Sequence, residues 1–146
     1  MWTPFQEIIF NETTNDVGQF TADIDSALDK VESYNFSIKV SLAKKKQASQ
    51  IAENLANQDY PAENRFTIEV KSLDRGIYNL ENERQLVLAR VDQAIRCLEM
   101  QRETANNLAG QVEGEEQENA LIAVGKWDAD IVYLQLRREV LGHSMQ

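Results

Sequence analysis

The fold is decided by the stretch VKSLDRGIYNLENERQLVLARVDQAIRCL, residues 70–98, in which apolar side chains recur at alternating steps of three and four. The spacing continues to residue 112, and only Arg84 and Gln101 interrupt it. The apolar positions are Val70, Leu73, Ile77, Leu80, Val87, Val91, Ala94, Leu98, Ala105, Leu108 and Val112. Because a seven-residue repeat of this length is typical of a coiled-coil seam, it predicts a helix over about 65–110. Gly76 costs about 1 kcal/mol relative to Ala inside a helix and indicates a kink or a close helix approach.

The same spacing predicts two further helices, one on either side of this seam. The first covers about 16–58 and stops before Pro61, which cannot donate a backbone hydrogen bond. Its apolar positions are Val17, Phe20, Ile24, Leu28, Val31, Tyr34, Ile38, Leu42, Ala48, Ala52 and Leu55. The other covers about 115–141, with Ala120, Val124, Trp127, Ile131, Leu134 and Leu141 on its seam. Its apolar face is broadened by Leu121, Ile122, Val132, Leu136 and Val140, so we expect this helix to contact more than one neighbour.

Short connections between the helices predict antiparallel neighbours, hence an all-α, elongated antiparallel three-helix bundle or coiled coil. We expect a short N-terminal aromatic arm at 1–15 and a single helical coiled-coil domain at 16–146. Charges support pairing of the first two helices. Folding about residue 61 sets Asp23, Asp25, Asp29 and Glu32 opposite Arg90, Arg96 and Arg102, and Lys39 and Lys44–Lys46 near Asp74, Glu81 and Glu83.

The three helices differ in length, because about 43, 46 and 27 residues rise by 1.5 Å each. The shortest therefore leaves the hairpin tip, about 42–83, without a third helix. Apolar residues continue through this tip, and exposed apolar patches mark interaction surfaces. The predicted protein-interaction residues there are Leu42, Ile51, Leu55, Phe66, Val70, Leu73 and Ile77.

The N-terminal arm contributes three more predicted interaction residues, Trp2, Phe5 and Ile9. Thr3 and Pro4 stand in good order for the cap and first position of a helix. The arm either folds onto the end of the bundle near Gly114 or docks into a groove of another chain, since short aromatic amphipathic helices suit such grooves.

The composition of the chain excludes several classes of functional site. The 146 residues carry a net charge of −9, with one Cys and one His. They cannot form an intrachain disulfide or a standard zinc site, so we expect no metal, no cofactor and no catalytic residue. We expect Cys97 to be a buried or half-buried structural thiol and His143 to be solvated. No signal peptide or membrane span is apparent, so we expect a cytoplasmic protein that does not bind membranes.

The negative charge also argues against nucleic acid as a partner. The exception is Lys44, Lys45 and Lys46, which could contact phosphate or an acidic partner but more readily form a solvated or hairpin-paired face. The leading hypothesis is a non-enzymatic assembly or scaffold protein, homo-oligomeric or bridging partner proteins. The alternative is a small acidic chaperone or inhibitor, of the secretion or phage type, that binds one partner. The third hypothesis is a nucleic-acid accessory protein that uses the lysine cluster.

Overall fold

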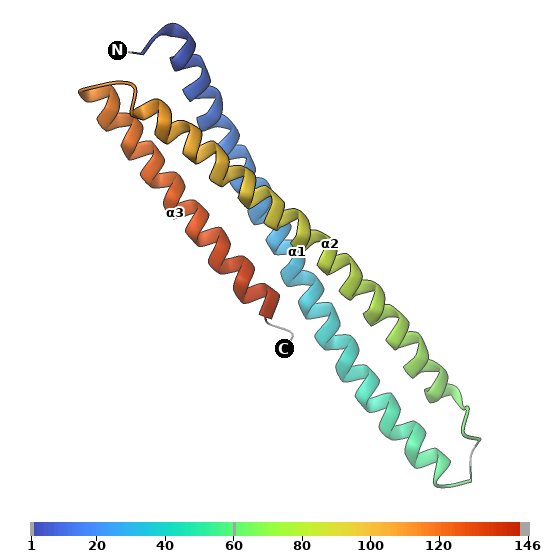
Figure 1. Ribbon diagram of the computed structural model, residues 1–146. Coiled ribbons are helices and arrows are strands. Elements are labelled where there is room, and N and C mark those ends of the chain that lie inside the picture. The colour runs from blue at the N-terminus through green and yellow to red at the C-terminus, as the bar shows by residue number, and fades with distance from the viewer. Residues whose placement is uncertain (1, 60, 144–146) are drawn as a thin grey trace. The chain divides into compact units, whose positions relative to one another are not determined.

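The computed structural model describes residues 2–59 and 61–143, apart from the side chains of Phe5, Ile8, Ile9, Thr13 and Thr14. It consists of three packed α-helices (Figure 1). They are α1 (Pro4–Ala56), α2 (Arg65–Ala109) and α3 (Glu115–His143). No β-strand occurs within the described ranges. The predicted all-α three-helix bundle is confirmed, and the bounds of α2 and α3 lie within two residues of those expected.

Helix α1 begins earlier than the sequence indicated, at Pro4 instead of near residue 16. Thr3 Oγ1 accepts a hydrogen bond from the Gln6 backbone N–H at 3.2 Å, and Gln6 Oε1 accepts one from the Thr3 N–H at 3.0 Å. This reciprocal capping box, with proline at the first helical position, starts the helix. The polar run 13–16 does not stop it, because residues of this kind cost only about 0.5–0.7 kcal/mol each inside a helix.

The other two helices also begin at local capping features. Asn64 Oδ1 accepts hydrogen bonds from the backbone N–H groups of Phe66, at 2.9 Å, and Thr67, at 3.3 Å, as an N-cap residue does. Gly114 precedes α3 with a φ of 70°, a left-handed conformation that glycine adopts without strain. The first turn of α3 contains Glu115, Glu116 and Glu118, whose charges favour the positive end of the helix dipole.

The chain divides into two compact units. The three-helix unit comprises residues 1–29 and 88–146, and the hairpin unit comprises residues 30–87. Helices α1 and α2 contribute a segment to each unit, whereas α3 belongs only to the three-helix unit. The hairpin unit therefore contains no third helix, as the unequal helix lengths predicted.

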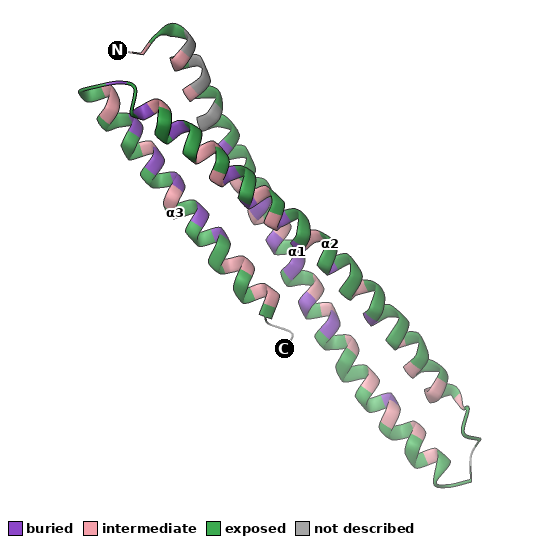
Figure 2. Ribbon diagram, viewed as in Figure 1, coloured by how far each residue is buried: buried purple, intermediate pink, exposed green. Residues whose placement is uncertain are grey.

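The three-helix unit contains most of the buried apolar side chains, drawn purple in Figure 2. They are Val17, Ile24 and Leu28 on α1, Leu88, Val91, Ile95, Leu98, Ala105 and Ala109 on α2, Val112 in the turn, and Ala120, Val124, Trp127, Ile131 and Leu134 on α3. Trp127 is buried as predicted. Leu88, Ile95 and Ala109 lie outside the predicted seam, each four residues after a seam position. They are buried because α2 has two neighbours here, and one seam cannot face both.

The hairpin unit buries only four apolar side chains among its described residues: Val31, Ile38, Ala48 and Ile77. It also buries a polar pair. The Arg84 Nε–H donates a hydrogen bond to Asn35 Oδ1 at 2.6 Å, and both side chains are buried. Arg84, which interrupts the apolar seam, thus remains inside the helix pair because Asn35 on the facing helix accepts a hydrogen bond from its guanidinium.

The predicted placement of charges holds for Lys45 and for Asp23, which lines one groove with Arg90 of α2, but Asp25 and Asp29 pair with α3. Lys45 Nζ lies 2.6 Å from Asp74 Oδ1, so the basic half pairs with α2 as expected. Asp25 and Asp29, however, bind Arg137 of α3 and not an arginine of α2. The expectation considered only the first two helices, whereas α3 packs beside α1 and offers a cation that is closer.

We predict that Asn35 and Arg84 are energetically coupled. Asn35→Leu or Arg84→Leu alone removes this hydrogen bond and leaves a buried polar group without its partner, which costs about 1–3 kcal/mol. The double variant removes both groups, so its loss falls short of the summed single losses by about 1 kcal/mol or more. Urea unfolding of all four proteins measures this, with the exposed Asn79→Leu as control. Additive losses would contradict the prediction.

Gly76 was expected to mark a kink or a close helix approach, and the second expectation is wrong. A Cβ built at Gly76 meets no atom within 4 Å, and the residue is exposed. We predict that Gly76→Ala raises the free energy of unfolding by about 0.5–1 kcal/mol, because alanine loses less backbone entropy in a helix. Thermal and urea unfolding measure this, and a destabilised variant would contradict it.

Candidate functional site

The outward face of α3 is one candidate interaction surface. With 3.6 residues per turn, the apolar residues of α3 fall on two opposite faces. One face is buried in the three-helix unit. The opposite face carries Leu121, Ile122, Val132, Tyr133, Leu136 and Val140, all exposed. Val132, Leu136 and Val140 are 51%, 57% and 67% exposed, whereas the Tyr133 hydroxyl donates a hydrogen bond to Asp25 Oδ1 of α1 at 3.4 Å. We call these six residues the outward α3 face.

Helix α3 does contact both neighbours, but through its buried stripe and its arginines. Arg137 Nη1 donates to Asp25 Oδ1 at 2.6 Å and to the Asp25 backbone carbonyl at 3.0 Å. Arg137 Nη2 donates to Asp29 Oδ1 at 2.5 Å. Partial burial lowers the pKa of Arg137, but the hydrogen bonds and negative charges of Asp29 and Asp25 outweigh it and raise the pKa overall. The guanidinium therefore remains charged and holds α3 against α1.

Two further ion pairs join α3 to α2. Arg138 binds Asp92 in a fork, with Nε 2.7 Å from Oδ1 and Nη2 3.1 Å from Oδ2. Arg102 Nη1 lies 3.1 Å from Asp128 Oδ1. Forked arginine–carboxylate pairs restrict orientation as well as distance. Together with the Arg137 contacts they agree with the rotation of α3 that its buried stripe favours, in which the opposite face lies in solvent.

The N-terminal aromatic residues Trp2 and Phe10 pack against the N-terminal half of α3. The ring centroids of Trp127 and Phe10 are 5.8 Å apart, and those of Phe10 and Trp2 are 5.2 Å apart. The Trp2 backbone N–H donates to Glu116 Oε2 at 2.5 Å. Trp2 thus folds onto its own chain, the first of the two predicted alternatives. The side chains of Phe5 and Ile9 lie outside the described residues.

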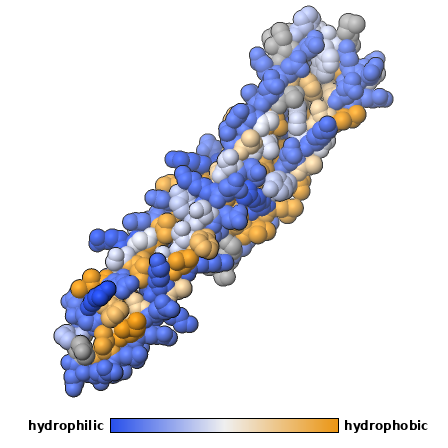
Figure 3. Space-filling view, turned by 180° about the vertical axis from the view of Figure 1, so that it is seen from behind, coloured by the Kyte–Doolittle hydropathy of each residue, from blue (hydrophilic) through white to orange (hydrophobic). Residues whose placement is uncertain are grey.

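Charged side chains of both signs surround the outward α3 face. Glu118 lies one turn before Ile122 in the same row, whereas Lys126 and Glu139 lie on either side of that row. The exposed Arg96 of α2 lines one groove with Glu139. Figure 3 shows hydrophobic side chains in patches among hydrophilic ones on the face that it draws. The outward α3 face is therefore an apolar surface with a mixed charged surround.

The predicted interaction residues of the hairpin unit divide into three groups. Leu42 and Ile51 are exposed. Leu55, Phe66, Val70 and Leu73 are half-buried. Ile77 is buried between the helices and is therefore not part of a surface. The hairpin unit leaves some of its seam accessible, and its described residues also expose large apolar side chains outside the predicted set: Phe36, Val40, Ile68, Tyr78 and Leu86.

Of the three lysines, Lys45 pairs across the hairpin with Asp74, and Lys44 and Lys46 are exposed. The interpretation as a hairpin-paired and solvated face is confirmed for Lys45. Contact of the cluster with phosphate or an acidic partner stays a prediction.

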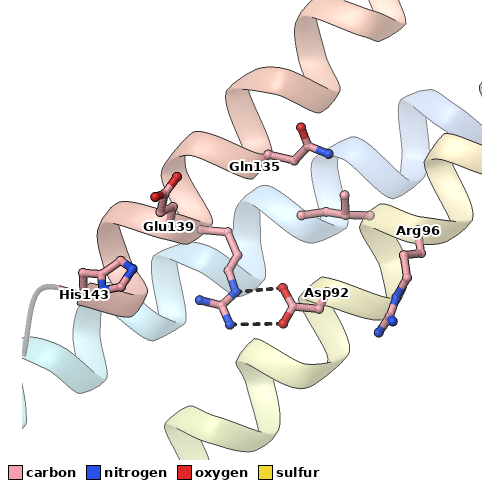
Figure 4. Close-up of a pocket in the computed structure, with 7 residues that line it drawn as sticks. Asp92, Arg96, Gln135, Glu139 and His143 are labelled. Carbon is pink, nitrogen blue, oxygen red and sulfur yellow. Dashed lines mark hydrogen bonds and ion pairs between the residues drawn. The ribbon is translucent and has the colours of Figure 1, made fainter.

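An open groove of about 440 Å³ lies between α2 and α3 in the three-helix unit (Figure 4). Asp92 and Arg96 of α2 face Gln135, Glu139 and His143 of α3 across it. The charge at its centre belongs to Arg138, whose guanidinium is already bound by Asp92. Because the Arg138 guanidinium already binds both carboxylate oxygens of Asp92, it contributes to the packing of α3 on α2 and is a poor site for an anion.

Metal and thiol chemistry gain no support from the described part of the chain. Within it, no group of three or more His, Cys, Asp and Glu side chains could hold a metal ion. Cys97 is exposed, so the expectation of a buried or half-buried thiol is wrong. The reason is its position one residue before Leu98, the fully buried seam residue, which turns Cys97 away from the core.

Compared with known proteins, the chain matches no family model, no curated protein and no solved structure. None of the helices in the described residues is both long and apolar enough to cross a membrane. The function is therefore inferred from the geometry of the chain itself.

We predict that Arg137 contributes measurably to stability. Arg137→Leu leaves the carboxylates of Asp25 and Asp29 one turn apart without their shared cation, which should lower the free energy of unfolding by about 1–3 kcal/mol. The matched control is Arg96→Leu, an exposed arginine of the same unit, with an effect of about 0.5 kcal/mol or less. Urea unfolding measures both, and equal effects would contradict the role given to Arg137.

Proposed function

We propose that the chain is a non-enzymatic assembly protein that acts through helix–helix contacts, by self-association or by bridging partner proteins. The outward α3 face is the observation that carries this proposal. Val132, Leu136 and Val140 follow one another at four-residue steps, the spacing by which one helix packs against another, and Leu121 and Ile122 lie on the same side of α3 nearer its beginning. The buried stripe of α3 already supplies the core contacts, so the outward face is in excess of what the fold uses.

The apolar residues elsewhere on the surface support the proposal less directly. Leu42 and Ile51 offer a smaller surface on the hairpin unit. Single exposed residues such as Leu86 and Met100 are common on proteins and call for no partner. A protein with one apolar surface in each unit is suited to hold two partners at once.

A small acidic chaperone or inhibitor is the second candidate, and the net charge of −9 in a chain of 146 residues favours it. A protein of this kind binds one partner in one complex, whereas a scaffold assembles several chains. The number of chains in the complex therefore distinguishes the two functions.

The test compares complexes formed by full-length variants. We predict that Val132→Gln with Leu136→Gln, expressed in the native source and recovered by an affinity tag, yields a complex of lower mass than the wild type. Leu86→Gln with Met100→Gln removes two equally exposed apolar side chains outside the stripe and should retain the wild-type mass. Leu42→Gln with Ile51→Gln examines the hairpin surface in the same way.

Circular dichroism should report equal helicity for all these variants, because every replaced side chain is exposed. Native mass measurement then gives the number and mass of the bound chains. An unchanged complex in the α3 variant, or a wild-type chain recovered alone, would overturn the proposed function.

A further inference from the structure

We propose that a groove between α1 and α2 in the three-helix unit is the contact surface of a symmetric dimer, so that a second copy of the chain covers it. This inference rests on the proposed function, whose self-association it specifies, and it uses a surface other than the outward α3 face. In the dimer, Asp23 of each copy would pair with the partner's Arg90.

The groove combines accessible apolar side chains with two charges. It is open, has a volume of about 140 Å³, and lies wholly within the three-helix unit. Its apolar lining consists of Phe20, Ile24 and Ala27 of α1 and Val91 and Ala94 of α2. Phe20 is 38% exposed, and Ala27 and Ala94 are half-buried. Asp23 on the α1 wall and Arg90 on the α2 wall supply one charge of each sign.

These two charges are not neutralised by the part of the chain that the structure describes. Within residues 2–59 and 61–143, neither Asp23 nor Arg90 forms an ion pair. Asp23 Oδ1 accepts a hydrogen bond from Gln19 Nε2 of its own helix at 3.0 Å. Three other arginines of this unit, by contrast, each bind a carboxylate of another helix. The groove therefore offers one carboxylate and one guanidinium to a partner.

The register of the two helices explains why Asp23 and Arg90 do not meet within one copy. Gln6 Nε2 of α1 donates a hydrogen bond to Gln111 Oε1 of α2 at 2.8 Å. Counting along the antiparallel helices from this pair places each of the two charged residues opposite an alanine of the facing helix. Asp23 and Arg90 are thus displaced from each other by about one helical turn along the groove, on opposite walls.

A twofold axis through the middle of the groove removes this displacement. Such an axis places the α1 wall of one copy over the α2 wall of the other and reverses its direction. Asp23 then lies over the partner's Arg90, and Arg90 lies over the partner's Asp23. Ala27 likewise meets the partner's Ala94, and small residues at a helix contact allow close approach. The groove is self-complementary in charge and in size, which favours a second copy of the chain over an unrelated partner.

The net charge of the chain limits the stability of this dimer. Each copy carries −9, which opposes association, although the groove itself contributes one charge of each sign. At about 0.15 M salt, charges more than about 8 Å apart are largely screened. We therefore expect a dissociation constant of about 1–100 µM, in the range of small interfaces.

Charge reversal tests the dimer in the full chain, with sedimentation equilibrium as the measurement. We expect Asp23→Lys alone, or Arg90→Glu alone, to raise the dissociation constant by at least about tenfold, because each variant places like charges in both pairs. An equimolar mixture of the two variants should dimerise within about threefold of the wild-type constant. In that mixed dimer, both pairs again join opposite charges.

Asp130→Lys and Arg96→Glu are the matched controls. They reverse exposed charges of the same unit outside the groove and change the net charge by the same amounts. Alone or mixed, they should dimerise like the wild type. Circular dichroism should report equal helicity for all four variants, because every replaced side chain is exposed.

Three results would overturn the inference: a wild-type chain that is monomeric up to about 200 µM, a dimer that either charge reversal leaves intact, or a mixture that stays monomeric. A dimer that is insensitive to these reversals but is lost in Val132→Gln with Leu136→Gln would place the second copy on the outward α3 face instead.

The purified chain tests this inference, whereas the mass of the native complex tests the proposed function. If the purified chain is monomeric but the native complex loses mass in the Val132→Gln, Leu136→Gln variant, the inference fails and the proposed function stands. If the native complex is unchanged in that variant, the proposed function itself fails.

Discussion

The rotation of α3 about its own axis is the constraint on which the candidate surface depends. Its buried stripe, from Ala120 to Leu134, faces the core. Arg138 lies one turn after Leu134 in line with this stripe and binds Asp92 of α2, and Arg137 beside it binds Asp25 and Asp29 of α1. Because the stripe and these ion pairs favour the same rotation of α3, its opposite face remains in solvent. Had the arginines been lysines, single-point contacts would have restricted the helix less.

The difference between the two units also has a specific origin in α2. In the hairpin unit, the positions four residues after the seam are Asp74 and Glu81, both exposed. In the three-helix unit the corresponding positions are Leu88, Ile95 and Ala109, which are buried, and Arg102, which is half-buried and pairs with Asp128 of α3. The apolar residues of this second row allow α2 to accept a second neighbour. This change from charged to apolar occurs at residue 88, where the three-helix unit resumes.

The helices and most of the core could be predicted from the sequence, because spacing in a helix translates directly into a face. The sequence also contains the spacing of the second row, with Leu88 and Ile95, but the prediction of one seam on α2 did not include these residues. Asn35 could not have been recognised as the partner of Arg84, since the two lie on different helices and only the packed register brings them within 2.6 Å. Cys97 was expected to be at least half-buried because it precedes the seam residue Leu98, but one step along a helix rotates a side chain by about 100°, which places the Cys97 side chain in solvent.

The sequence by itself determined that the chain forms three long helices, where two of them begin and end, and that α3 carries apolar residues beyond one stripe. Local hydrogen bonding and apolar periodicity act over a few residues, so they can be read without a fold. Only the tertiary structure decided which of the two apolar faces of α3 is buried, that the acidic half of α1 pairs with Arg137, and that Trp2 packs on its own chain. Each of these outcomes depends on which of several possible partners, far apart in the sequence, the packing of the helices brings into contact.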